Sequence, residues 1–128
     1  MVAPIKIGRL NILKVLFHID QSVNWKMTVT NVINMLDYGK SESIPFTIEI
    51  VANGEAVMEL SNRASSENSI GERLNAIAEL GVIIVACNNA LKAHKVDAAD
   101  LHTFITIVPA GVVEIAARQS EGYAYIKP

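Results

Sequence analysis

The sequence predicts one α/β domain of three layers, in which helices cover both faces of a mostly parallel five-stranded sheet. Segments with the composition of strands alternate with segments of helical periodicity from residue 13 onward, a pattern typical of βα units. The run 82–86 is continuously apolar and rich in Val and Ile, as in a strand buried on both faces of a parallel sheet. The 128 residues suffice for one domain with a substantial core, and we expect a single domain over residues 1–128.

The predicted strands are short apolar or alternating runs that are bounded by polar turns. Residues 1–12 precede the first of them and form a leader. They contain Pro4 and Gly8 without a clear period, so we expect this leader to pack late or to stay mobile. The five strands are predicted at residues 13–19, 46–52, 82–87, 104–108 and 123–126.

The first two predicted helices follow the first two strands. Apolar residues recur at helical spacing over 25–36, and Gly39 is predicted to end that helix. After the turn Asn53–Gly54, residues 56–60 favour a short helix over a hairpin. The polar stretch 61–68 is expected to be an exposed, mobile connector.

The later helices carry clear signals at their ends. A capping-box spacing that begins at Ser69 opens one helix, and Gly81 closes it. Asp97 is a predicted N-cap, because its side-chain oxygen can accept a free backbone N–H. Residues 109–111 turn into the last helix, which Gly122 is predicted to end.

Composition excludes several classes of function. The net charge of −2 and the absence of a basic block make nucleic acid an unexpected partner. The apolar runs are too short to span a bilayer. One cysteine cannot form an internal disulfide, which fits a reducing compartment, and we expect a cytoplasmic protein. The apolar share of 51% is high for so small a domain and indicates a buried interface between subunits.

The third predicted strand ends on Cys87, the only cysteine of the chain. Asn88 or Asn89 can cap a following helix, so we expect Cys87 where a central strand passes into a helix. In open α/β sheets, ligands and chemistry collect at this carboxyl edge, and the positive end of the helix dipole favours a thiolate there. The alternative is that Cys87 fills space in the core, because free cysteine is among the most buried residue types.

Four segments of the chain, taken in order, form a recognisable set: Phe17–Asp20, Val51–Gly54, Gly81–Lys92, and Val108–Gly111 together with Gln119–Pro128. Together they resemble the DsrE/DsrF-like family of small sulfur-relay proteins, and the resemblance extends from Lys14 onward. The resemblance implies a flavodoxin-like fold, a homo-oligomer such as a trimer or a hexamer, and a redox-active cysteine at the position of Cys87. It also implies that this cysteine accepts sulfane sulfur as a persulfide and passes it on.

Further pocket residues are expected around Cys87. In a flavodoxin-like strand order the first strand lies beside the third, so His18 or Asp20 is expected to face Cys87. A protonated His18 would favour the thiolate and Asp20 would oppose it; alternatively, His18 is a core histidine bonded to backbone. The other pocket candidates at this edge are Asn53, Gly54, Asn88, Asn89, Pro109 and Gly111.

No cofactor and no metal are expected. His18, His94, His102 and Cys87 show no spacing typical of a metal site. The turn after the first strand lacks glycine and begins with Asp20, which would repel the phosphate of a flavin. The sequence also contains no G-x-S-x-G motif for a serine nucleophile.

The leading functional hypothesis is a sulfur carrier that holds a persulfide on Cys87. Its partners would be a sulfur donor and a sulfur acceptor protein, and its activity would be that of a sulfurtransferase-like carrier at most. The alternative is a non-enzymatic, oligomeric module that binds a small ligand or a partner segment, with Cys87 in a structural role.

Overall fold

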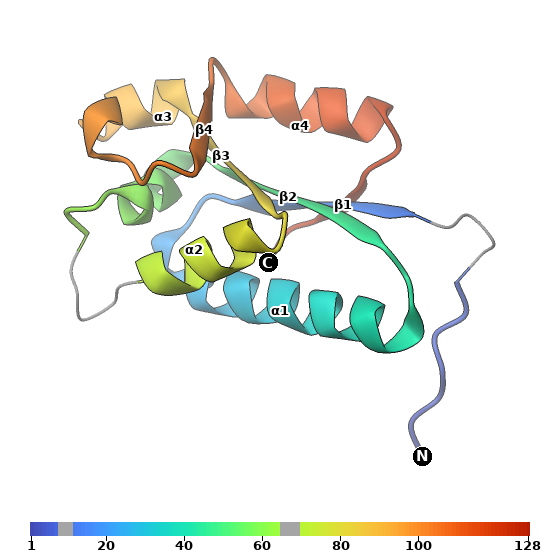
Figure 1. The fold of residues 1–128 in the computed structure, drawn as a ribbon. Helices are drawn as coiled ribbons and strands as arrows, with labels where there is room; N and C mark the ends of the chain where they lie inside the picture. Colours follow the sequence, from blue (N-terminus) through green and yellow to red (C-terminus); the bar gives the residue numbers. More distant parts are fainter. Residues whose placement is uncertain (8–11, 65–69) are drawn as a thin grey trace.

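The computed structural model describes residues 1–7, 12–64 and 70–128. Its centre is a five-stranded parallel sheet in the order β4-β3-β2-β1-β5 (Figure 1). All five predicted strands are confirmed, the first two of them to the residue. Their bounds are Leu13–Ile19 (β1), Phe46–Ala52 (β2), Ile83–Cys87 (β3), Ile105–Val108 (β4) and Ala124–Ile126 (β5).

Helices cover both faces of the sheet, which confirms the predicted three-layer α/β class. Helices α1 (Trp25–Glu42) and α2 (Gly71–Glu79) lie on one face, and α4 (Gly111–Ser120) lies on the other (Figure 1). The short helix α3 (Asn88–Ala93) follows β3 directly. Three 3-10 segments complete the described elements: Ser22–Asn24 (η1), Gly54–Leu60 (η2) and Ala98–Asp100 (η4).

The core is divided unequally between the two faces, because successive side chains of a strand point to opposite sides. Phe17, Ile50 and Ile84 face α1 and α2, and belong to a large buried cluster that also contains Trp25 and Leu74. The cluster under α4 is small. Its buried members are Leu16, Val51, Val85 and Ile115.

The strand order corrects one expectation. β1 lies between β2 and β5, and β2, the middle strand, separates it from β3. The first and third strands are therefore not neighbours, and β3, although paired on both sides, is not the middle strand. Helical periodicity shows that a crossover occurs, but it does not show on which side of the existing strands the next strand is added.

Gly39 does not end the first helix. α1 continues to Glu42, and Ser43 ends it in the left-handed region with φ 56°. A Cβ on Gly39 would lie 2.6 Å from the Ile44 carbonyl oxygen and 2.7 Å from the Phe46 ring. This glycine therefore permits the chain to pass closely over the helix on its way into β2.

The other helix signals are largely confirmed. Gly81 and Gly122, with φ of 97° and 92°, follow α2 and α4, and the segment after Asn53 is a short 3-10 helix. Asp97 Oδ1 accepts the backbone N–H of Ala99 at 2.9 Å, as an N-cap does. Ser69, the start of the predicted capping box, lies outside the described residues.

The polar connector is described only in part, because residues 65–68 lie outside the described ranges. Asn62 and Arg63 are exposed, as expected. They are also tied to a neighbouring segment: the Asn62 N–H donates to the Asp100 carbonyl at 2.7 Å, and Arg63 Nε lies 3.2 Å from Asp100 Oδ2. Residues 1–6 of the leader are exposed. None of the helices in the described ranges is long and apolar enough to cross a membrane.

Candidate functional site

Cys87 is the last residue of β3 and the N-cap residue of α3. The predicted strand-to-helix junction is therefore confirmed, but the capping detail is wrong. Asn88 and Asn89 are the first two residues of α3, and no side chain caps this helix. The backbone of Cys87 itself makes the turn. The residue is 6% exposed, so its thiol is nearly covered.

A second helix begins beside Cys87. Gly111 is the first residue of α4, and a Cβ placed on it would lie 3.1 Å from Cys87 Cβ and 3.3 Å from Asn53 Cβ. Only a residue without a side chain lets α4 approach this closely. The first backbone N–H groups of a helix lack partners within the helix and carry partial positive charge. Both α3 and α4 thus begin beside Cys87, and the start of a helix favours negative charge.

A chain of side-chain hydrogen bonds crosses from β5 to the end of β2. His18 Nδ1 lies 2.6 Å from the Tyr125 hydroxyl, and His18 Nε2 lies 3.1 Å from Asn53 Oδ1. Because an amide oxygen only accepts, His18 donates from Nε2, and the Nδ1 of the neutral ring accepts the Tyr125 O–H. The imidazole therefore fixes the Asn53 amide with its oxygen toward His18.

The NH₂ group of the Asn53 amide lies on the side of Cys87. Asn53 Nδ2 is 3.5 Å from the point where a Gly111 Cβ would sit, the same point that Cys87 Cβ approaches to 3.1 Å. Asn53 is consequently the polar side chain nearest to this contact, and its NH₂ group is a donor. His18 can influence the surroundings of Cys87 only through Asn53, because β2 lies between β1, which carries His18, and β3, which carries Cys87.

These contacts correct both expectations for His18. The first strand does not place His18 directly against Cys87, and the partners of its ring are side chains instead of backbone. Tyr125 was missed, although it fixes the outer end of the chain. Its only signal in the sequence was an aromatic residue in the last strand, and nothing in that pattern indicates pairing of β5 with β1.

Asp20 and Gly54 form a separate contact at the same edge. Asp20 Oδ1 pairs with Lys127 Nζ at 3.0 Å. Gly54 has φ 54°, and a Cβ on it would lie 3.0 Å from the Asp20 carbonyl oxygen. The Asp20 charge is therefore balanced by Lys127, and no contact recorded for the described residues joins it to Cys87.

The remaining candidates line the rim of the site. Asn88 is half-buried, whereas Asn89 and Pro109 are exposed. Among the described residues, no three His, Cys, Asp or Glu side chains are grouped so that they could hold a metal ion.

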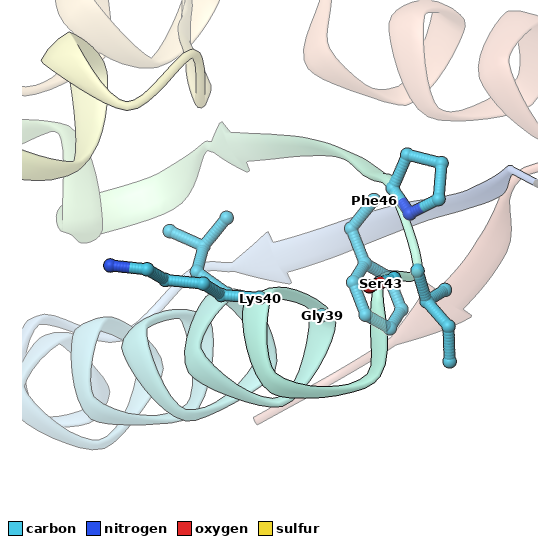
Figure 2. Close-up of a pocket in the computed structure, with 7 residues that line it drawn as sticks. Gly39, Lys40, Ser43 and Phe46 are labelled. Atoms are coloured by element: carbon cyan, nitrogen blue, oxygen red, sulfur yellow. The ribbon is translucent and has the colours of Figure 1, made fainter.

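A surface depression of about 350 Å³ lies away from this site, where α1 ends and β2 begins. Figure 2 shows Lys40, Ser43 and Phe46 around it. Parallel strands begin at the edge opposite to Cys87, so this depression belongs to the other edge of the sheet. It contains no residue of the candidate site.

Replacing Gly111 by alanine should disturb the site without unfolding the domain. The added methyl group would stand 3.1 Å from Cys87 Cβ, which overpacks the contact and should cost about 1–3 kcal/mol of stability. Urea unfolding measures this cost, and the alkylation rate of Cys87 reports the displaced thiol. Ala116→Ser, at an exposed position of the same helix, is the control. An unchanged alkylation rate in Gly111→Ala would show that α4 does not press on Cys87.

Comparisons with known proteins agree with the fold. A family model for the DsrE/DsrF-like family matches residues 14–128. The structure of MTH1491, a protein of unknown function from Methanobacterium thermoautotrophicum, is similar with a TM-score of 0.78 and 32% identity, over 91% of this chain and 99% of that one. BT1422 from Bacteroides thetaiotaomicron, another protein of unknown function, shares the fold with a TM-score of 0.61 and 19% identity, over 92% and 95% of the two chains. No curated protein matches the chain. Since the family model covers almost all residues after the leader, the chain belongs to the DsrE/DsrF-like family.

Proposed function

We propose that this protein carries sulfane sulfur as a persulfide on Cys87 and delivers it to a partner. The observation that supports this most is the surrounding of Cys87: two helices begin beside it, and the Asn53 amide is held nearby by His18. Membership of a family associated with sulfur relay supports it as well. The proposal places the protein in the cytoplasm, where a free thiol persists.

The chemistry requires no cofactor and no external oxidant. In loading, the Cys87 thiolate attacks the outer sulfur of a donor persulfide. A bond forms between Cys87 Sγ and that sulfur, the S–S bond of the donor breaks, and the donor leaves as a thiolate with the electron pair. In delivery, an acceptor thiolate attacks the outer sulfur, and Cys87 leaves as a thiolate again.

The residues around Cys87 have distinct roles in this proposal. Free N–H groups at the helix starts stabilise the thiolate and the persulfide anion. Asn53 donates from its NH₂ group to the same charge, and His18 with Tyr125 keeps the amide in that orientation. His18 and Tyr125 are thus positioning residues.

We further propose that the protein acts as a homo-oligomer, a trimer or a hexamer. Val112 and Val113 are each 64% exposed at the start of α4, and Tyr125 is 42% exposed. These apolar side chains lie near the edge that holds Cys87. Closed symmetry between copies would bury them.

Mass spectrometry tests the carrier directly. After incubation with a low-molecular-weight persulfide, the intact native protein should gain one sulfur atom, and a thiol reductant should remove it. Cys87→Ser, the matched control, should gain nothing, because no other cysteine exists in the chain. Native protein that folds normally but gains no sulfur from the donor would contradict the proposal.

The low exposure of Cys87 favours one alternative, a binding module in which this thiol is only structural. In that case Cys87→Ser places a hydroxyl in an apolar site and should cost about 1–3 kcal/mol. The same preparation distinguishes the two functions. A carrier gives a sulfur adduct and a Ser variant of nearly unchanged stability, whereas a structural cysteine gives no adduct and a weakened variant.

A further inference from the structure

A buried carboxyl group lies under α4, and the site described above does not use it. Glu49 is in the middle strand β2, where it pairs with Leu16 of β1 and Ile83 of β3. It is 3% exposed. Its Oε2 has no hydrogen-bond partner among the described residues. An ionised carboxylate in such a place would be strongly destabilising. The packing of α4 over β2 therefore favours the protonated form of Glu49.

The positive charge that acts on Glu49 is shared with other carboxylates. Glu114 and Arg118 face Glu49 from α4, and the Arg118 guanidinium forms ion pairs with Glu114 at 3.5 Å and with Glu121 at 3.0 Å, although its buried Nε has no hydrogen-bond partner among the described residues. Tyr123 also interacts with Glu49, and Lys14 Nζ lies 5.8 Å from the Tyr123 ring centre and 3.5 Å from the Glu121 carbonyl. From β3 only the apolar Ile83 lies beside it.

These surroundings raise the pKa of Glu49 from its ordinary 4.5 to about 8. Burial is the largest cause, followed by the hydrogen bond and the negative charge of Glu114; Arg118 opposes the rise and Glu121 adds to it. The pKa of the Tyr123 hydroxyl is raised as well, first by burial and then by the charge of Glu49. Burial is the first cause of both shifts, and the negative charges of Glu114 and Glu121 contribute to each.

The same helix begins against Cys87, which is also a member of the large buried cluster. Its first residue, Gly111, touches Cys87, whereas Glu114 and Arg118, one and two turns later, lie over Glu49. Among the described residues, the buried apolar contact beneath α4 is that of Ile115 with Leu16, Val51 and Val85, and the half-buried Val108 and Tyr123 pack against the same cluster. An element with so few buried apolar contacts is readily released by local unfolding, and a thiol with 6% exposure becomes accessible only if its cover moves.

We propose that α4 is a pH-sensitive lid over Cys87, kept closed by protonated Glu49 on the strand beneath it. The lid would regulate the thiol on which the proposed carrier function rests. When α4 lifts, Glu49 meets water and returns to its ordinary acidity. Opening then releases a proton at any pH between the two pKa values.

This proton release makes the lid open more often as the pH rises. The stabilisation of the closed lid is complete below pH 4.5 and is lost as the pH rises to about 8. Within that window the opening equilibrium increases by up to about tenfold per pH unit. Over the whole window the upper limit is about three-thousandfold. Cys87 is therefore most protected in acid and most available in mildly alkaline solution.

Comparison of wild type with Glu49→Gln tests the lid. Glutamine imitates the protonated carboxyl but does not ionise. The observable is the alkylation rate of Cys87 by iodoacetamide, with no sulfur donor present, between about pH 5 and about pH 9. The wild-type rate is divided by the Glu49→Gln rate, which cancels the ionisation of the Cys87 thiol that both proteins share. This ratio should be near one in acid and should increase at least about tenfold at alkaline pH. Glu79→Gln, an exposed carboxyl on α2, should match wild type throughout.

Hydrogen exchange on wild type alone supplies a second measurement that needs no variant. After correction for intrinsic exchange, the amides of α4 should lose protection between about pH 5 and about pH 8, and those of α1 should keep it. A rate ratio that stays flat with pH, or loss of protection in α1 and α4 together, would overturn the lid. Neither measurement involves persulfide, so a failed sulfur loading leaves the lid intact, and a failed lid leaves loading intact.

Discussion

Replacing Asn53 by aspartate should slow persulfide loading of Cys87 by about tenfold to a hundredfold. The variant exchanges an NH₂ donor for a carboxylate at nearly constant size. In the proposed mechanism the thiolate then loses the hydrogen bond from Asn53, and such a bond is worth about 1.5–3 kcal/mol when one partner is charged. The thiolate also gains a repelling neighbour. The measurement is the initial rate of sulfur gain by intact mass, at fixed donor concentration and pH.

Asn89→Asp is the matched control for this prediction. It makes the same chemical change at an exposed position in the first turn of α3, where an acidic residue is compatible with the helix dipole. Its loading rate should stay within about twofold of wild type, since an exposed charge is screened by solvent. If both variants load equally slowly, the cause is net charge at the edge, and Asn53 has no specific role.

Replacing Trp25 by alanine should reduce the free energy of unfolding by about 3–5 kcal/mol. Trp25 is 1% exposed at the start of α1. Its Nε1–H donates to the Ala56 carbonyl at 2.9 Å. The side chain thus joins α1 to η2, the segment that follows Asn53. Its removal leaves a large cavity and a carbonyl without its donor, and much of the total stability of a small domain would be lost.

Trp25→Phe separates the cost of the cavity from the cost of the lost hydrogen bond. Phenylalanine retains much of the apolar volume but cannot donate, so the variant should be destabilised by less than the alanine variant. Urea unfolding of both variants gives the comparison. A cost below about 1 kcal/mol for Trp25→Ala would contradict the core position of Trp25, because truncation of a buried tryptophan typically costs about 3–5 kcal/mol.

Gly39 shows a limit of predicting helix ends from the neighbouring sequence. Glycine is a common helix terminator, and the sequence around it gives no other reason for its presence. The structure supplies the reason: the Ile44 carbonyl and the Phe46 ring occupy the space of a side chain at Gly39. A close approach between segments is not visible in a periodic pattern, so the end of α1 was predicted too early.

The elements and the junction at Cys87 were determined by the sequence itself. Strand and helix periodicities are local properties, because each depends on residues that follow one another within a few positions. The continuous apolar run before Cys87 fixed it at the end of an interior strand, and the residues after it indicated a helix. The class of fold followed from the alternation of these elements.

Only the tertiary structure decided which residues surround Cys87. The order of parallel strands depends on how crossovers pack against a sheet that is already formed, and this involves residues far apart in the chain. That order places Asn53 at the Gly111–Cys87 contact, joins His18 to Tyr125, and buries Glu49 under α4. Alternation along β2 predicted that Glu49 and Ile50 point to opposite faces, but not that Glu49 would lie beneath α4. A carboxyl on a strand has the same pattern in water as beneath a helix, and the physical difference arises only when the layers close over it.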